Sequence, residues 1–362
     1  MTSYSQNPLA CYEKLIEKEG FLRDEIQLSI LLVLNALQRS LINKRGVLSG
    51  IFGQRPFNLY LWGAVGRGKT LLVDCLVQSL PAHQVKRIHF YAFMQTLHAA
   101  MKESQGQADP LLKYAQSLGK DLLVMVLDEF MVHDIVDAML LKQLLQAFQQ
   151  VGVTLVTTSN VPPGKLYEGG LQRSRFLSAI QFIEDHFKII ELQSAQDYRL
   201  RALRQDKAYF QHSEVSHEAM LACFKRLSPC LPEENVNLWL DDRAIPTIAL
   251  ANDAVWLDFN VICGAQRGPR DYLALSNLFH TVLIERVPPL DDKHSDTVRR
   301  FMMLVDAFYD RGVHLILVAE VSLDHLYEGT RFEAEWGRIH SRLIEMQSEA
   351  YHQKRHEVKS AI

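Results

Sequence analysis

Long apolar runs, paired cysteines and an excess of charge of one sign are all missing from this sequence of 362 residues. No apolar stretch approaches the roughly 18 residues of a membrane-spanning helix, and residues 1–20 lack the basic and apolar regions of a signal peptide. The five cysteines form no CxxC pair, which fits reduced thiols better than a disulfide framework. These absences predict a soluble, cytoplasmic protein without a transmembrane segment.

The charge balance is nearly even, with 39 Lys and Arg residues against 42 Asp and Glu residues and a net charge of −3. Proteins that bind nucleic acid through their overall charge are basic, so a nucleic-acid partner is not favoured, although a local basic patch is compatible with this balance. The length predicts two or three domains.

Helical periodicity and short apolar runs alternate through the first 205 residues. Helices alternating with wholly apolar strands indicate a parallel sheet covered by helices on both faces. The expected elements are helices over 8–42, 70–81, 94–104 and 136–150, and strands within 55–63, 85–93, 122–127 and 153–160.

The remaining residues begin with short strands and polar turns over 237–261, and the alternating pattern then returns. Residues 151–170 align without gaps on residues 311–330 with eight identities, which predicts a helix–strand–loop unit used twice. At this offset of 160, the phosphate loop described next would fall on residues 223–230, which contain no glycine. We therefore expect any second nucleotide fold to be degenerate.

The sharpest motif lies between an apolar strand and a helix, where residues 63–70 read GAVGRGKT and match the phosphate-loop pattern G-x-x-x-x-G-K-[ST]. The loop amides wrap nucleotide phosphates, Lys69 reaches the β- and γ-phosphates, and Thr70 coordinates Mg²⁺. A coincidental glycine loop is the alternative. The predicted nucleotide-binding residues are Gly63, Ala64, Val65, Gly66, Arg67, Gly68, Lys69 and Thr70.

Three polar residues follow in the order expected of a nucleotide hydrolase. Asp128, at the end of an apolar run, is predicted to bind Mg²⁺, and the adjacent Glu129 to activate the attacking water. Asn160, at the tip of the next predicted strand, is expected to orient that water. An acid pair that caps a helix and an Asn that forms a turn are the structural alternatives, and only the order of the motifs favours catalysis.

Two arginine groups are less specific. Arg173 follows a loop and is predicted to be an arginine finger for a neighbouring subunit's nucleotide, with Arg175 as the substitute and a plain surface arginine as the alternative. Arg267, Arg270 and Asp271 lie in a glycine-bearing loop. They are either nucleotide sensors or parts of a solvated turn, and the turn is the preferred interpretation.

The motifs together resemble the ZapE family of bacterial cell-division ATPases and the related mitochondrial lactation-elevated ATPases. The resemblance covers the chain from about residue 59 to residue 351. It departs from the family at Ala64, where glycine is frequent, in the sequence FLSAI that follows Arg175, and before the SRL that contains Arg342, to which no role is assigned. The matching segments read YLWGAVGRGKT, RIHFYAFM, VLDEFMVHDIVDAM, TLVTTSNVPPGKLYEGGLQR, DYRLR, RDYLAL, VHLILVAEV and SRLIEMQSEAY.

The resemblance implies an α/β P-loop fold of the AAA+ type, with a parallel sheet covered by helices and a second, mixed α/β segment. It implies that ATP and Mg²⁺ are the cofactors. Lys69 would be the Walker A lysine, and Asp128 and Glu129 would be the Walker B pair. Asn160 would be sensor 1, and Arg173 would be the arginine finger. The implied partner is the tubulin-like division-ring protein, met by a nucleotide-dependent homo-oligomer recruited to the division site. The lack of a transit peptide favours the bacterial branch.

The expected function is Mg²⁺-dependent ATP hydrolysis that remodels a protein assembly. The alternative is a DNA-associated loader or helicase accessory ATPase, which shares the motif order but would need a basic groove. A small-molecule kinase fits the Asp128–Glu129 pair less well, and a GTPase would need an NKxD motif. The expected parts are an N-terminal helical segment (1–50), a P-loop ATPase core (51–205) and a C-terminal α/β segment with a partial internal repeat of the core (206–362).

Overall fold

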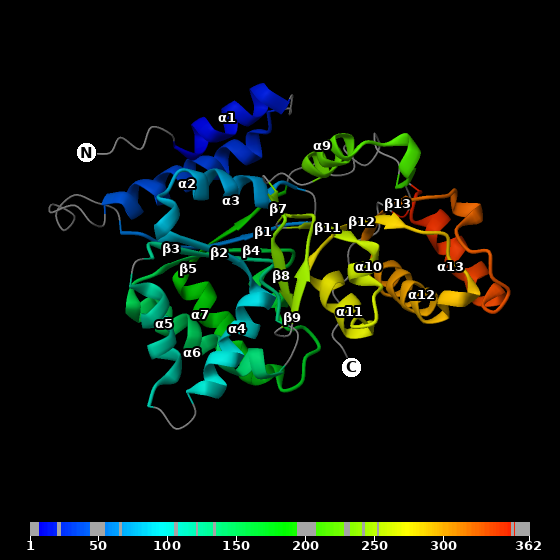
Figure 1. Cartoon of the computed structure of the whole chain (residues 1–362). Helices are drawn as coiled ribbons and strands as arrows, with labels where there is room; N and C mark the ends of the chain where they lie inside the picture. The colour runs from blue at the N-terminus through cyan, green and yellow to red at the C-terminus, as the bar shows by residue number, and fades with distance from the viewer. Residues whose placement is uncertain are drawn as a thin grey trace. The chain divides into compact units, whose positions relative to one another are not determined.

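The chain forms two compact units in the computed structural model. Unit 1 comprises Met1–Gln196 with Ser360–Ile362, and unit 2 comprises Asp197–Lys359. Figure 1 colours unit 1 from blue to green and unit 2 from green to red. The structure describes residues 7–19, 23–43, 55–64, 67–104, 108–120, 122–132, 135–193, 208–227, 232–240, 243–251, 253–348 and 351.

Unit 1 is built on a five-stranded sheet in which all the strands pair in parallel. Its strands, in spatial order, are β2 (Val85–His89), β3 (Val124–Asp128), β4 (Thr154–Ser159), β1 (Asn58–Trp62) and β5 (Phe187–Glu191). Because β4 lies between β1 and β3, the carboxyl ends of these three strands are neighbours. In open α/β sheets this is the edge at which ligands bind.

Helices cover both faces of this sheet, as Figure 1 shows. Neighbouring strand residues alternate between two apolar clusters, Leu59 with Val126 on one face and Tyr60 with Leu127 on the other. The expected helix-covered parallel sheet is therefore confirmed. One face carries α1 (Pro8–Glu19), α2 (Glu25–Asn43) and α3 (Lys69–Gln78), and the other carries α4 (Phe90–Glu103), α5 (Pro110–Gly119), α6 (Ile135–Val151) and α7 (Arg173–His186).

Three local expectations were wrong. The single helix expected over 8–42 is two helices, and Asp24 accepts a hydrogen bond from the Ile26 amide at 2.8 Å to start α2. The strand expected over 85–93 ends at His89, because the aromatic run that follows lies on the buried face of a helix. Helix α5 was missed, although Pro110 stands in its first turn, where proline favours a helix start.

Among the described helices, α2 alone is long and apolar enough to cross a membrane by length and composition. Half of the apolar stretch of α2 is buried inside unit 1. Leu31, Leu34 and Leu37 of α2 are fully buried in the cluster that also contains α3. The apolar character of α2 is thus used in packing against the phosphate-loop helix.

Unit 2 contains a six-stranded mixed sheet and several helices, which confirms the expected mixed α/β segment. β6 (Tyr209–Gln211), β13 (His314–Ala319), β12 (Thr281–Val287) and β11 (Ala254–Asp258) pair in parallel, and β10 (Ala249–Leu250) and β7 (Glu233–Glu234) continue the sheet antiparallel. β8 (Asn237–Leu240) and β9 (Arg243–Pro246) form a separate hairpin. The described helices of unit 2 are α9 (His217–Leu227), α10 (Phe259–Ile262), α11 (Pro269–Leu278), α12 (Ser295–Asp310) and α13 (Glu333–Glu345).

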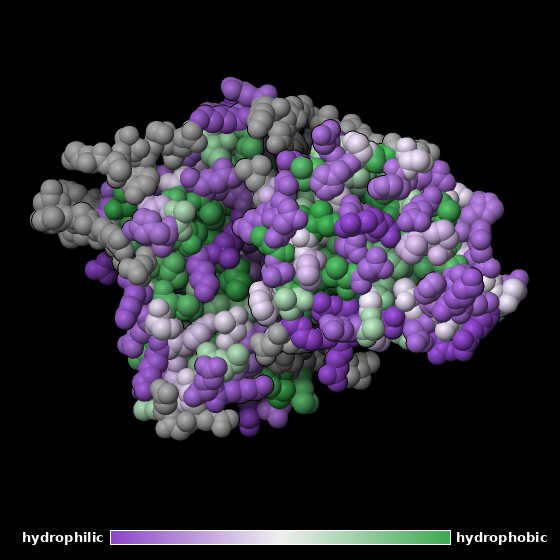
Figure 2. Space-filling view, viewed as in Figure 1, coloured by the Kyte–Doolittle hydropathy of each residue, from purple (hydrophilic) through white to green (hydrophobic). Residues whose placement is uncertain are grey.

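The helices of unit 2 are amphipathic in the same way as those of unit 1. Helix α9 follows β6 and packs its buried Met220 and Phe224 with Trp256 of β11. Helix α13 buries Trp336, Ile339 and Leu343. Figure 2 shows mainly hydrophilic residues on the visible surface where α12 and α13 lie, so these helices turn polar faces outward.

The two sheets repeat one topology. Helix α6, strand β4 and helix α7 begin 160 residues before α12, β13 and α13 respectively. Strand β1 lies beside β4 as β6 lies beside β13. Tyr60 of β1 and Tyr209 of β6 both donate a hydroxyl hydrogen bond to the loop after that neighbour, at 2.9 Å to the Val161 carbonyl oxygen and at 2.7 Å to that of Val321. Strands β11, β12, β13 and β6 of unit 2 thus follow the order of β2, β3, β4 and β1 of unit 1, and we propose that this reflects a partial internal repeat.

This topology places the unit 2 equivalent of the phosphate loop at other residues than the offset of 160 gave. It follows β6 at residues 212–216, and the expectation that placed it at residues 223–230 was wrong because residues 223–227 lie inside α9. The offset differs because strands β7–β10 lengthen the connection from α9 to β11. Residues 212–216 read HSEVS, without glycine, where the phosphate loop of unit 1 has three glycines.

Candidate nucleotide-binding site

Three of the sequence-predicted side chains meet at the carboxyl ends of β1, β4 and β3. Lys69, the first residue of α3, donates a hydrogen bond from Nζ to Asn160 Oδ1 at 2.8 Å. Asn160 in turn donates from Nδ2 to Glu129 Oε2 at 2.8 Å. The amide of Asn160 therefore connects the lysine ammonium to the glutamate carboxylate through its acceptor and its donor.

The Lys69 side chain is held inside the loop that precedes it. Its Nζ also donates to the carbonyl oxygens of Gly63 at 2.8 Å and of Ala64 at 3.1 Å, and the residue is only 5% exposed. A buried ammonium is costly unless its three donors are satisfied. These contacts supply acceptors for it among the described residues.

The start of the phosphate loop is tied to the neighbouring strands. The Gly63 amide donates to the Ser159 carbonyl oxygen at 3.1 Å, and a Cβ at Gly63 would lie 2.6 Å from the Leu192 carbonyl oxygen. No side chain fits at this position without a shift of the backbone. The predicted binding residues Val65 and Gly66 lie outside the described residues.

The end of the loop opens α3 in the manner of an anion site. Gly68 is the N-cap of α3 and no side chain caps the helix. Thr70 is the second residue of this helix, in its first turn. Within the described part of the chain, the buried Nη1 of Arg67 has no hydrogen-bond partner. Backbone N–H groups at an uncapped helix N-terminus favour phosphate.

Asp128, at the end of β3, is buried and charged. Its Oδ1 accepts a hydrogen bond from Thr158 Oγ1 at 3.0 Å, and its Oδ2 accepts one from Arg87 Nε at 2.5 Å. Burial raises the pKa of Asp128, but the charge and hydrogen bond of Arg87 outweigh it and hold the pKa below its usual value. The carboxylate is therefore ionised over the physiological pH range.

Arg87 is a residue that the sequence analysis missed. It lies on β2 and forms ion pairs with both Asp128 of β3 and Asp74 of α3, all three side chains being at most 14% exposed. A signal was present, because an arginine within a strand of the sheet is largely buried and then needs a counter-ion nearby. The identity of that counter-ion depends on β2 and β3 being neighbours.

Glu129 has an unusual backbone conformation. Its φ is 50°, in the left-handed region that non-glycine residues seldom adopt. Thr158 of β4 holds this turn, since its Oγ1 accepts from the Glu129 amide at 3.2 Å and its carbonyl oxygen accepts from the Phe130 amide at 2.7 Å. Conformations of this kind persist where surrounding contacts impose them and occur often at active sites.

The structure does not bring Arg173 to the group formed by Lys69, Asn160 and Glu129. Arg173 is the first residue of α7, and its Nη2 donates to the Gly164 carbonyl oxygen at 2.5 Å. Arg175 is exposed on the same helix. Both arginines thus lie in the first turn of one helix.

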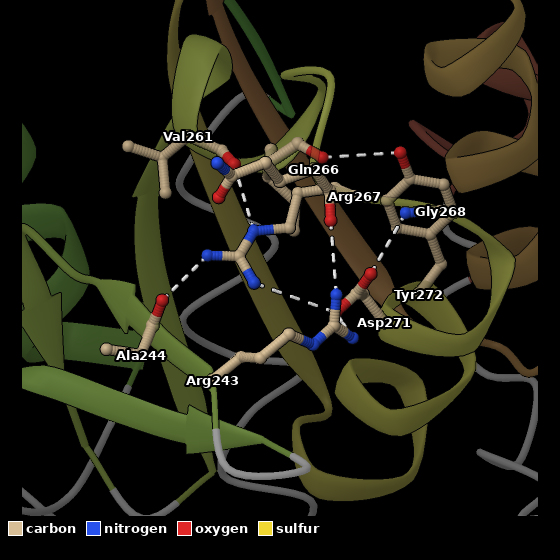
Figure 3. Close-up of polar contacts among 9 residues, drawn as sticks. Arg243, Ala244, Val261, Gln266, Arg267, Gly268, Asp271 and Tyr272 are labelled. Carbon is tan, nitrogen blue, oxygen red and sulfur yellow. Dashed lines mark hydrogen bonds and ion pairs between the residues drawn. The ribbon is translucent and has the colours of Figure 1, made fainter.

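The loop with Arg267 and Asp271 forms a closed network inside unit 2, shown in Figure 3. Arg267 donates to the carbonyl oxygens of Ala244 at 2.7 Å and Val261 at 3.4 Å, and its Nη1 lies 3.7 Å from Asp271 Oδ1. Arg243 of β9 also pairs with Asp271, at 2.7 Å. These contacts favour the structural interpretation, in which the loop fastens the β8–β9 hairpin to α11.

Comparison with known proteins adds the following findings. The sequence model of the AFG1-like ATPase family matches residues 6–355. The cell division protein ZapE of Escherichia coli is 38% identical, covering 97% of this chain and 99% of its own length. Lactation elevated protein 1 homolog B of Danio rerio is 32% identical over 80% of this chain and 61% of its own length.

Solved structures give a weaker likeness. DnaA from Aquifex aeolicus bound to AMPPCP has a TM-score of 0.36 at 17% identity, covering 52% of this chain and 53% of that one. The DnaC helicase loader has a TM-score of 0.35 at 15% identity, covering 53% of this chain and 100% of that one.

Proposed function

The chain belongs to the AFG1-like ATPase family, and from this premise we propose that its AAA+-type ATPase activity is Mg²⁺-dependent and remodels a protein assembly of the bacterial division ring. Membership of the family makes the chain an ATPase. The metal, the roles of individual residues and the assembly that is remodelled are the proposed parts.

The hydrogen-bonded group of Lys69, Asn160 and Glu129 carries the proposal for the chemistry. Lys69 would bind the β- and γ-phosphates, and Glu129 would accept a proton from the attacking water as a general base. Asn160, which contacts both, would hold that water in line. The Thr158 hydroxyl of β4 accepts a hydrogen bond from the Glu129 amide, and Asn160 donates one to the Glu129 carboxylate, so both ends of the proposed base are held in place.

The oxygen donors suit Mg²⁺. Thr70 offers a hydroxyl in the first turn of α3, and Asp128 offers a carboxylate whose pKa lies below its usual value because of Arg87. Mg²⁺ is held in nucleotide sites by one or two such protein oxygens together with substrate phosphates and water. The absence of a group of three or more acidic, His or Cys ligands among the described residues is compatible with this donor set. The bound ion would neutralise charge on the phosphates.

The proposed partner is the tubulin-like polymer of the division ring. This proposal comes from the similarity to a cell division protein over almost the whole chain. The net charge of −3 is compatible with a protein partner and gives no general attraction to nucleic acid. The proposed place of action is the cytoplasm, with recruitment to the division site.

We further propose a nucleotide-dependent homo-oligomer in which Arg173 reaches the nucleotide of the adjacent copy. Its position at the start of α7, with Nη2 bonded to the Gly164 carbonyl oxygen, is compatible with action on a neighbour. Arg173→Ala should leave ATP binding intact and lower turnover by about 10³-fold or more. Arg175→Ala tests the substitute candidate on the same helix, and a loss of turnover there with normal turnover in Arg173→Ala would make Arg175 the finger. A loss confined to ATP binding would instead make Arg173 a structural residue.

The decisive experiment measures ATP hydrolysis with and without the assembled division-ring polymer, in the presence of Mg²⁺ or of a chelator. The proposal expects stimulation by the polymer and loss of turnover on chelation, and it expects no stimulation by DNA. Stimulation by DNA alone would overturn the proposed partner and favour a loader or helicase accessory.

A further inference from the structure

Helix α2 runs beside α3 from one end to the other. Gln27, near the start of α2, donates from Nε2 to the Arg67 carbonyl oxygen at 3.0 Å, just before α3 begins. Gln38 donates from Nε2 to the carbonyl oxygen of Ser79, the C-cap of α3, at 3.2 Å. Eleven helical residues rise by about 16 Å, close to the length of α3. The two glutamines therefore hold opposite ends of the phosphate-loop helix.

The orientation of the Gln27 amide follows from its neighbours. The Arg67 carbonyl oxygen can only accept, so Nε2 must face it. Oε1 then faces the hydroxyl of Tyr12 on α1, which donates to it at 2.7 Å. Gln27 is 1% exposed and Tyr12 is 2% exposed. Tyr12 thus orients the Gln27 side chain, and Gln27 in turn bonds the loop at the Arg67 carbonyl oxygen.

The bond to Arg67 also sets the direction of a loop amide. In a trans peptide unit the carbonyl oxygen and the following N–H point to opposite sides. Since the Arg67 carbonyl points at Gln27, the Gly68 N–H points away from α2. No described residue accepts a hydrogen bond from this N–H. As far as the described residues go, this N–H can donate to a phosphate oxygen.

Gly68 shows how closely Gln27 approaches the loop. Its φ is 93°, a region that favours glycine, and a Cβ there would lie 2.6 Å from Gln27 Nε2. A side chain at Gly68 would therefore displace the end of the Gln27 side chain as well as strain the backbone. Gln27 thus lies directly against the loop, in contact with both Arg67 and Gly68.

We propose that Gln27, oriented by Tyr12, is a positioning residue of the phosphate loop, because its hydrogen bond to the Arg67 carbonyl aims the Gly68 amide at the nucleotide phosphate. This inference rests on the proposed nucleotide site. It gives α1 and α2 a direct part in nucleotide affinity.

The test compares Gln27→Met with Gln38→Met, a matched pair of buried glutamines that each bond one end of α3. Binding of a non-hydrolysable ATP analogue with Mg²⁺ is measured by calorimetry, and thermal unfolding and ATPase kinetics are measured alongside. Gln27→Met should weaken binding about tenfold, equivalent to about 1.4 kcal/mol, and raise KM for ATP with little change in kcat. Gln38→Met should lower the Tm about as much as Gln27→Met does, but it should leave the affinity for the analogue within about twofold of the wild type.

The outcomes separate the inference from the function on which it rests. Wild-type affinity in Gln27→Met, or an equal loss of affinity in Gln38→Met, would overturn the role of Gln27. Failure of the wild-type chain to bind the analogue would instead overturn the proposed nucleotide site. Tyr12→Phe removes a single oxygen, so it decides the matter if Gln27→Met does not fold: about a threefold weakening supports the inference, and unchanged affinity contradicts it.

Discussion

Arg87 neutralises two acids at once, and the stability of unit 1 depends on it. Asp74 and Asp128 are both at most 5% exposed as residues, and Arg87 forms an ion pair with each. Two buried carboxylates without a counter-ion are strongly unfavourable. We expect Arg87→Ala to destabilise the fold by about 3–5 kcal/mol at neutral pH, measured by denaturant unfolding. The exposed Arg39→Ala is the control and should change stability by less than about 0.5 kcal/mol.

The same contact predicts a pH dependence. The pKa of Asp128 is lowered in the folded state, so its ionisation adds stability at pH values above its ordinary pKa of about 3.9, and this stability is lost as the pH falls through the folded value. Without Arg87, burial raises that pKa. Acid titration followed by circular dichroism should therefore show Arg87→Ala unfolding at a higher pH than the wild type, and identical midpoints would contradict the assigned cause.

Glu129 is the residue whose proposed role is the most specific. Glu129→Gln keeps the size of the side chain and removes its capacity to accept a proton. It should bind ATP with near wild-type affinity and hydrolyse it at least about 10²-fold more slowly, measured by calorimetry and phosphate release. Near-normal turnover would remove Glu129 as the general base.

At the scale of elements, equivalent tyrosines of β1 and β6 allow the contribution of the same contact to stability and to activity to be compared between the two units. Tyr60 and Tyr209 each bond the loop after the neighbouring strand, but only the loop that Tyr60 contacts, at Val161, follows Asn160. Tyr60→Phe and Tyr209→Phe should each cost about 1 kcal/mol of stability. Only Tyr60→Phe should lower ATP turnover, and equal activity of the two variants would separate this loop from catalysis.

Sequence patterns predicted elements well where the signal was local. The buried strands β3 and β4 and helix α6 are recognised by their apolar spacing alone. The boundary between β2 and α4 was misplaced because a run of aromatic residues is compatible with a strand and with one face of a helix. Helix α5 has only ten residues, so its periodicity was too short to stand out.

At the scale of the whole molecule, four parallel strands of unit 2 repeat the order of four strands of unit 1, and we propose that unit 1 alone binds the nucleotide. In unit 2 the loop after β6 has no glycine, and Glu218 lies in the first turn of α9 where unit 1 has Lys69 and Thr70. We expect one ATP per chain and no residual binding in Lys69→Ala, both measured by calorimetry. A stoichiometry of two, or binding retained by Lys69→Ala, would show that unit 2 also binds nucleotide.

The order of the motifs along the chain was sufficient to predict the α/β fold, the nucleotide-binding class and the candidate residues Lys69, Asp128, Glu129 and Asn160, because each motif is short and depends on neighbours in sequence. The tertiary structure alone decided which of them touch: Asn160 contacts Lys69 and Glu129 because β4 lies between β1 and β3. The contacts of Arg87 and Gln27 were likewise known only from the tertiary structure. Each bonds a group at least 40 residues away in sequence, and a contact across such a separation depends on packing, which local spacing does not encode.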